Sequence, residues 1–137
     1  MAKKSLDRLR VMIVDDHAVV REGLRNYLGV VGGIEIVGEA SNGAEALEVA
    51  KKAVPQVILM DLVMPVMDGI EATRRLHETM PDIKVIVLTS FANNDMLLPA
   101  LNAGAVAYLL KDAGLKELAE TIRAVSQGRY PTASTND

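Results

Sequence analysis

Residues 57–69 read VILMDLVMPVMDG, and this stretch decides the fold of the chain. Its first four residues are apolar and predict a short buried strand. Asp61 follows that strand directly and precedes a loop that contains Pro65 and Gly69. Open α/β sheets bind their ligands at the carboxyl ends of their strands, so Asp61 is a candidate for chemistry.

A second apolar run, residues 11–14, also ends in acidic residues, the pair Asp15-Asp16. In a parallel sheet the carboxyl ends of neighbouring strands lie at one edge, so three carboxylates are predicted to converge there. For either residue of the pair alone, a turn or a helix cap remains an equal alternative. A converging cluster of three carboxylates requires a cation.

Five short apolar runs predict five strands, at residues 11–14, 35–38, 57–60, 83–88 and 106–110. Segments with helical spacing separate these runs. The alternation predicts an α/β fold of the doubly wound (βα)5 type, with a parallel sheet and helices on both faces. Two helix starts are marked by the capping spacing of Asn42 with Glu45 and of Asp68 with Glu71.

Length and composition narrow the function classes. The chain has 137 residues, enough for one domain, and no cysteine, which excludes disulfides, thiolate metal sites and cysteine nucleophiles. Its net charge of -3 comes without a basic block, so this chain alone is not expected to bind DNA. No apolar run approaches the ~20 residues of a membrane span, and no signal peptide is recognisable, which favours a cytoplasmic protein.

Polar residues also follow the fourth and fifth predicted strands, where Thr89 and Lys111 stand. Each alone is more typical of a strand end or a solvated lysine. With the three carboxylates they suggest a site for a divalent cation and a phosphoryl group, because Mg²⁺ prefers oxygen ligands and phosphoryl transfer needs positioning and charge neutralisation. In this interpretation Asp61 is the nucleophile, and Asp15 and Asp16 hold the metal.

Several motifs resemble the receiver domain of two-component response regulators, in particular the NarL/FixJ (LuxR-like) subgroup. They are VDDH at 14–17, REGL at 21–24, MDLVMPVMDG at 60–69, LTSF at 88–91 and LNAGA at 101–105 with YLLKD at 108–112. The resemblance covers residues 9–128. It implies the flavodoxin-like receiver fold with strand order 2-1-3-4-5, an N-terminal extension at 1–8 and a linker or tail that begins at 129–137.

The resemblance implies a magnesium site and a phosphoacceptor. Asp61 would accept a phosphoryl group from a sensor histidine kinase. Asp16 and Asp61 would bind Mg²⁺ directly, Asp15 would help through water, and the backbone carbonyl of Val63 would complete the protein ligands. The domain would be a signalling phosphoacceptor that catalyses only its own phosphorylation and dephosphorylation.

The resemblance also implies a conformational switch. Thr89 and Lys111 would bind the phosphoryl oxygens, and Tyr108 would be the aromatic residue that turns inward as Thr89 moves. Phosphorylation would promote a homodimer through the first and fifth or the fourth and fifth helices. DNA would be bound only by a helix-turn-helix output domain that this chain does not contain.

Pro99 lies where the resemblance places the fourth helix. Proline is tolerated only near the start of a helix, so this helix is predicted to begin late, near Leu97 or Leu98.

Two other interpretations of these residues are open. A phosphatase similar to the haloacid dehalogenase superfamily also uses a strand-end Asp, but it needs a second Asp two residues later, where this chain has Val63. A receiver fold that binds partners without phosphate would not need the complete set of polar residues. Both fit the sequence less well than a phosphorylated receiver.

Overall fold

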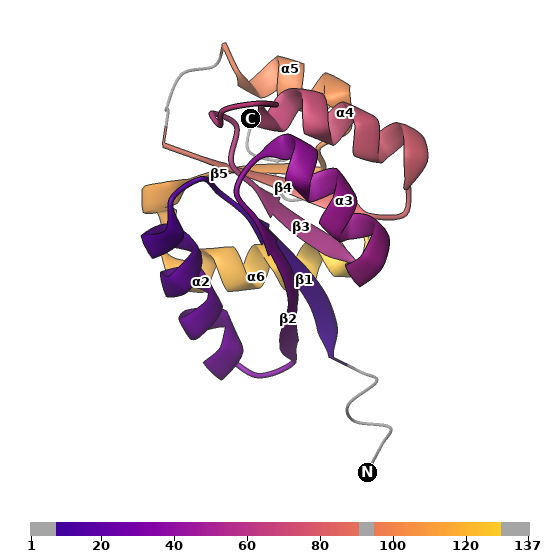
Figure 1. Cartoon of the computed structure of the whole chain (residues 1–137). Coiled ribbons are helices and arrows are strands. Elements are labelled where there is room, and N and C mark those ends of the chain that lie inside the picture. The colour runs from indigo at the N-terminus through magenta and orange to yellow at the C-terminus, as the bar shows by residue number, and fades with distance from the viewer. Residues whose placement is uncertain (1–7, 91–94, 130–137) are drawn as a thin grey trace.

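A five-stranded parallel sheet with strand order β2-β1-β3-β4-β5 forms the centre of the molecule (Figure 1). The computed structural model describes residues 8–90 and 95–129. The predicted extension at 1–8, the tail at 129–137 and Phe91 of the LTSF motif therefore lie wholly or almost wholly outside the described residues. The predicted fold class and strand order are confirmed.

The elements alternate along the chain. The strands are β1 (Leu9–Val14), β2 (Ile34–Ala40), β3 (Val57–Met60), β4 (Lys84–Thr89) and β5 (Ala107–Leu110). The helices are α2 (Ala18–Val30), α3 (Gly43–Ala53), α4 (Gly69–Thr79), α5 (Leu97–Ala103) and α6 (Leu115–Ser126), with a short 3-10 turn, η1 (Lys111–Ala113).

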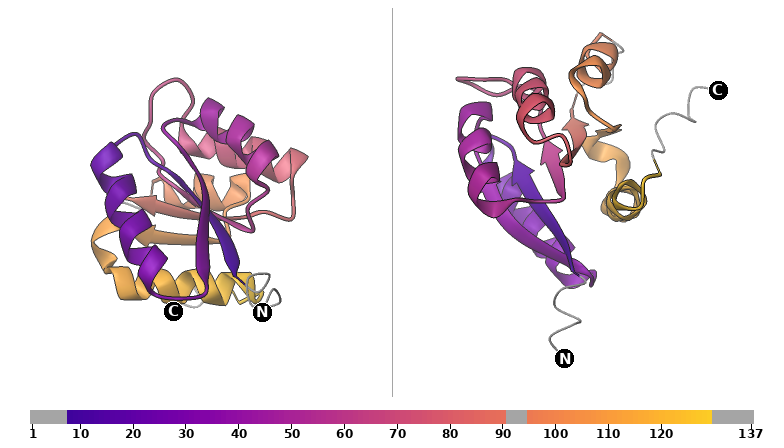
Figure 2. Two further views of the ribbon diagram at one scale, coloured as in Figure 1. Left: turned by 60° about the horizontal axis from the view of Figure 1, so that its bottom comes forward. Right: turned by 90° about the vertical axis from the view of Figure 1, so that its right-hand side faces the viewer.

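The helices cover both faces of the sheet, with α3, α4 and α5 on one face and α2 and α6 on the other (Figures 1 and 2). Because successive strand residues point to opposite faces, Met12 and Met60 pack under the first group of helices, whereas Ile13 and Leu59 pack under the second. Both layers are built mainly from aliphatic side chains. The central strands are buried on both faces, which explains their continuous apolar runs.

Strand register brings the polar strand ends together. Val14 pairs with Met60, Met60 with Val87, and Thr89 with Leu110. The residues that follow β1 and β3, the last residue of β4 and the first residue after β5 therefore lie at one edge of the sheet. We call this side of the sheet, where the parallel strands end, the carboxyl edge, and the side where they begin the amino edge.

The helices α3 and α4 begin at side-chain caps, as the sequence predicts. The side chain of Asn42 accepts a hydrogen bond from Glu45 N at 2.8 Å, and Asp68 accepts one from Glu71 N at 2.9 Å. Each cap is worth about 1 kcal/mol. In a capping box the third helical residue accepts a hydrogen bond from the backbone N–H of the cap. At α3 the carboxylate of Glu45 instead accepts from Ser41 N at 2.6 Å, one residue before the cap.

The helix α5 begins at Leu97 and has seven residues. Pro99 lies in its first turn, where a missing N–H costs little, so the predicted late start is confirmed. Met96, the residue before α5, carries no side-chain oxygen that could cap the helix. This helix thus starts with less local support than α3 or α4. Within residues 8–90 and 95–129, no helix combines the length and apolar character required to cross a membrane.

Candidate functional site

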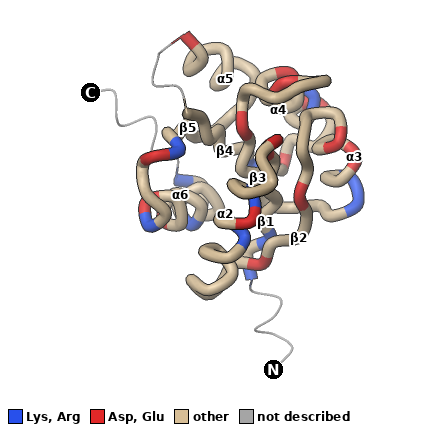
Figure 3. Tube along the Cα trace, turned by 60° about the vertical axis from the view of Figure 1, so that its left-hand side comes forward, with Lys and Arg blue, Asp and Glu red and all other residues tan. Residues whose placement is uncertain are grey.

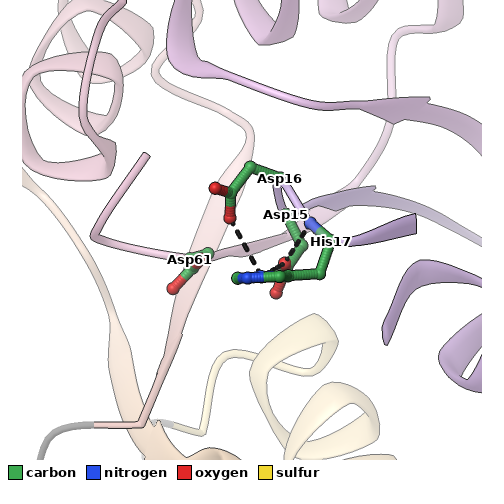
Figure 4. A group of neighbouring side chains, drawn as sticks. All are labelled: Asp15, Asp16, His17 and Asp61. Atoms are coloured by element: carbon green, nitrogen blue, oxygen red, sulfur yellow. Dashed lines mark hydrogen bonds and ion pairs between the residues drawn. The ribbon is translucent and has the colours of Figure 1, made fainter. Parts of the chain in front are cut away.

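Three carboxylates converge at the carboxyl edge of the sheet, as predicted. Asp15, at the end of β1, and Asp61, at the end of β3, are 2% and 5% exposed. Asp16 lies beside them with its side chain 29% exposed. One ligand atom from each of these residues and one from His17 lie within 4.8 Å of one another (Figure 4).

His17 is exposed but touches the acidic pair. Its Nδ1 lies 3.1 Å from an oxygen of Asp15 and 3.1 Å from an oxygen of Asp16 (Figure 4). Its backbone N–H donates to the same Asp15 oxygen at 2.9 Å, closing a turn between β1 and α2. This turn directs the side chain of Asp15 back toward the sheet edge.

The positively charged side chain of Lys111 contacts two of these carboxylates. It lies at the start of η1, and its Nζ is 2.6 Å from Asp15 Oδ2 and 3.6 Å from Asp61 Oδ2. Burial raises the pKa of Asp61 above its ordinary value, and the neighbouring Asp15 carboxylate raises it further, while Lys111 acts in the opposite direction. Because three carboxylates lie together and Lys111 carries one positive charge, the lysine neutralises only part of the negative charge of this cluster.

This donor set fits a hard divalent cation. It supplies carboxylate oxygens from adjacent strand ends, and Mg²⁺ is commonly bound in proteins by one or two carboxylates together with water. Burial and, after it, repulsion from Asp15 raise the pKa of Asp61, and a bound cation would act against both. Val63, in the loop after Asp61, is 51% exposed, and the role of its carbonyl as a ligand stays a prediction.

Gly69 shapes the loop that carries Val63. A Cβ atom at this position would lie 2.1 Å from the carbonyl oxygen of Asp61, so only glycine fits, and Gly69 N donates to Leu62 O at 2.9 Å. The sequence presents Gly69 as a loop residue. The close approach to Asp61 was missed, because it depends on how β3 and α4 meet.

Thr89 and Tyr108 lie where the sequence predicts. Thr89 is fully buried at the end of β4, the neighbour of β3. Tyr108 is half-buried in β5, packs against the core on the α3, α4 and α5 face, and its buried hydroxyl has no hydrogen-bond partner among the described residues. Burial raises the pKa of this hydroxyl. Their switching roles stay predictions.

Arg21 is a further residue at this corner that the sequence did not mark as functional. It lies in the first turn of α2, and its side chain reaches the backbone carbonyl of Asp15. The only sequence signal is a basic residue six positions after Asp15. Its second partner, Glu39, comes from another strand, so no local pattern reveals the contact.

Charges elsewhere on the molecule are mixed. Figure 3 shows basic and acidic residues interspersed along the part of the trace that is visible in this view. This agrees with the net charge of -3. Within residues 8–90 and 95–129, the charges do not form the basic patch that is typical of a nucleic-acid surface.

Comparison with known proteins identifies the arrangement. Residues 11–123 match the response regulator receiver domain. The transcriptional regulatory protein LiaR of Bacillus subtilis is 49% identical over 120 residues, which cover 88% of this chain and 57% of LiaR. The chain thus spans just over half the length of this curated relative.

Solved structures agree with this match. A two-component response regulator of the LuxR family from Aurantimonas superposes with a TM-score of 0.86 at 34% identity, over 90% of this chain and 88% of that one. The signal receiver domain of the response regulator NarL from Mycobacterium tuberculosis also gives 0.86, at 33% identity over 90% and 99%. The chain belongs to the receiver domains of two-component response regulators, in their LuxR (NarL/FixJ) group.

Proposed function

We propose that Asp61 is the phosphoacceptor of this receiver and that Asp15, Asp16 and Asp61, with the Val63 carbonyl, form its Mg²⁺ site. The observation that carries the proposal is the position of the buried Asp61 carboxylate, beside a second buried carboxylate and 3.6 Å from Lys111 Nζ. A nucleophile held among groups that bind a cation and a phosphoryl group is what phosphoryl transfer requires.

The transfer is a displacement at phosphorus. An oxygen of Asp61 forms a bond to phosphorus while the bond from phosphorus to the histidine nitrogen of the kinase breaks, and the electron pair returns to the imidazole. Lys111 and the hydroxyl of Thr89 bind the phosphoryl oxygens and neutralise or hydrogen-bond their charge. Mg²⁺, when bound, supplies further charge neutralisation. Hydrolysis of the acyl phosphate in the same site returns the domain to its starting state.

The switch is a shift between two conformations. Thr89 ends β4, and Tyr108 lies in the neighbouring strand β5, so a movement of Thr89 toward the phosphoryl group changes the space beside the Tyr108 ring. The phosphoryl group must bind the two conformations unequally, and a swing from 1:99 to 99:1 takes about 5.5 kcal/mol. The surface of α5, β5 and α6 reports the change.

Response regulators act with sensor kinases, and those of the LuxR group act on DNA through an output domain. For this chain we propose a cytoplasmic location, a sensor histidine kinase as phosphoryl donor and a phosphorylation-promoted homodimer. In the whole protein, dimerisation would control DNA binding by an output domain. The support is the LuxR-group membership and the length of LiaR, of which this chain covers 57%.

The test is intact-mass measurement after incubation with acetyl phosphate and Mg²⁺. We expect one added phosphoryl group on the wild type and none on Asp61→Asn or in the presence of chelator. Asp68→Asn, which changes an acidic residue of the same loop outside the cluster, is the matched control and should still be phosphorylated. No adduct on a folded wild-type domain at any time point would refute the proposal.

A further inference from the structure

Arg21 on α2 contacts both the end of β1 and the strand β2, next to the carboxylate cluster. Its Nη1 donates to the backbone carbonyl of Asp15 at 2.5 Å, and its Nε lies 3.2 Å from Glu39 Oε1 on β2. The other oxygen of Glu39 is held by Arg25 Nη1 at 2.5 Å. Arg21 is only 20% exposed and Glu39 27%, so the guanidinium is held in one place.

The carbonyl that Arg21 binds belongs to the peptide between Asp15 and Asp16. Asp15 N is still part of the sheet, donating to Ala40 O at 3.1 Å, and β1 ends at Val14. A peptide unit is planar, so the direction of the Asp15 carbonyl also fixes the N–H and Cα of Asp16. The hydrogen bond from Arg21 therefore controls where the side chain of Asp16 leaves the backbone.

Arg21 differs from Lys111 in the atom that it binds. Lys111 occupies a carboxylate oxygen of Asp15, at 2.6 Å, and so competes with a cation for that oxygen. Arg21 binds the backbone carbonyl of Asp15 and so does not itself compete with a cation for a carboxylate oxygen of Asp15 or Asp16. A planar guanidinium can bridge a carbonyl and a carboxylate at once, which a single ammonium does less well.

We infer that Arg21, oriented by Glu39, is a positioning residue for the Mg²⁺ site and acts through the Asp15–Asp16 peptide. The inference rests on the proposed function, since it assigns Arg21 a role toward the metal proposed there. Residues that orient metal ligands typically change metal affinity 10- to 100-fold when they are mutated. The expected effect is on Mg²⁺ affinity and not on the phosphoryl chemistry itself.

The test is a Mg²⁺ titration of the unphosphorylated domain, followed by the amide NMR signals of Asp16 and Asp61. Arg21→Met should raise the Kd for Mg²⁺ roughly tenfold, with Arg21→Lys in between. Arg25→Met is the matched control, because Arg25 holds the same Glu39 but does not reach the Asp15 carbonyl, and its Kd should stay within about twofold. Thermal unfolding of each variant separates a loss of fold from a loss of affinity.

A second measurement separates positioning from general structural support. At saturating Mg²⁺, the rate of phosphorylation of Arg21→Met by acetyl phosphate should return to within about threefold of the wild type. Glu39→Gln keeps an acceptor for the guanidinium and should raise the Kd less than Arg21→Met does. If Arg21→Met does not fold, the Kd values of Arg21→Lys and Glu39→Gln decide the question.

Wild-type Mg²⁺ affinity in folded Arg21→Met would overturn the inference and leave the proposed function intact. Wild-type domain that binds no Mg²⁺ would overturn both. An affinity loss in Arg21→Met that is matched by Arg25→Met would assign the effect to the stability of the α2–β2 contact and would also overturn the positioning role.

Discussion

The two edges of the sheet are built on opposite principles. At the amino edge, Arg10 donates to the carbonyls of Ala53 and Val54, and Gln56 accepts from Arg10 N at 2.9 Å, so polar side chains complete backbone hydrogen bonds. At the carboxyl edge, buried carboxylates crowd around Lys111, and the pKa of Asp61 is raised. One edge is therefore organised for stability, whereas the other holds buried negative charge beside Lys111.

Each edge also holds a valine in the left-handed backbone region. Val54, at the end of α3, has φ 48, and Val66, in the loop after Asp61, has φ 70. A β-branched residue rarely adopts this conformation. At Val54 the strain is held by Arg10, which binds its carbonyl at 3.2 Å, while at Val66 a tight turn is closed by Met67 N donating to Pro65 O at 2.7 Å.

The largest expected effect is at the carboxyl edge. Without Mg²⁺ at neutral pH, Asp61→Asn should increase the free energy of unfolding by about 2 kcal/mol, because it removes a buried and poorly compensated charge. The folded-state pKa of Asp61 is raised, so the wild-type carboxyl favours folding when it is protonated, below about pH 4, and this contribution is lost as the pH rises through the folded-state pKa. The gain from Asn should therefore shrink as the pH falls.

Urea unfolding at several pH values, with chelator present, measures this difference. Asp112→Asn removes an exposed carboxylate at the same edge and serves as the control. A gain for Asp61→Asn that grows at low pH, or no gain at neutral pH, would show that the buried charge does not destabilise the fold.

The amino edge should respond in the opposite direction. Arg10→Met keeps most of the apolar stem but loses the hydrogen bonds to the carbonyls of Ala53 and Val54, so we expect the free energy of unfolding to fall by about 1.5 kcal/mol. Arg8→Met, at an exposed position, is the control. Denaturant unfolding is the measurement, and a stabilised Arg10→Met would show that the Arg10 hydrogen bonds do not stabilise the amino edge.

The same substitution at Val54 and at Val66 should have different consequences at the two edges. Glycine adopts a positive φ without steric cost, and we expect both Val54→Gly and Val66→Gly to stabilise the domain by about 1 kcal/mol. Only Val66→Gly should also change Mg²⁺ affinity, because its loop carries Val63. Unfolding curves and Mg²⁺ titrations of both variants give the answer, and equal titrations would show that the strain at Val66 is unrelated to the site.

The smallest expected change in the free energy of unfolding is in α5, the element that follows β4 in the chain. Pro99→Ala should change the free energy of unfolding by less than about 0.5 kcal/mol, because the first-turn N–H that it restores has no partner within the helix. Ala100→Pro is the contrasting variant, since Ala100 N donates to Met96 O at 3.1 Å and Ala100 is fully buried. Hydrogen exchange of the α5 amides compares them, and a strong stabilisation by Pro99→Ala would mean that proline loosens this helix.

The sequence predicts the strands, the capped helices and the converging residues because each has a local signal. Four apolar residues before Asp61 mark β3, and the spacing of Asp68 with Glu71 marks the start of α4. The contacts of Arg21 with Glu39 and of Gly69 with Asp61 have no such signal. They join segments whose meeting depends on helix placement over the sheet, which local patterns do not encode.

His17 illustrates the same limit at shorter range. A histidine after two aspartates at a helix start is expected on the surface, and its side chain is 65% exposed. Its ring nevertheless lies 3.1 Å from both neighbouring carboxylates, because the turn that begins at Asp15 brings three consecutive side chains to one side. Exposure was predictable from the sequence, whereas the contact depended on the turn.

The close approach of Gly69 to the Asp61 carbonyl has a consequence for labelling the molecule. It makes residues 61–69 a closed loop of fixed length, whose ends admit no added atoms, while Val66 near its tip is 83% exposed. The chain contains no cysteine, so a Val66→Cys substitution would introduce its sole thiol. A fluorophore attached there would sit on the same short loop as Asp61, the phosphoacceptor proposed above, and a change in its emission on treatment with acetyl phosphate would follow the reaction in real time.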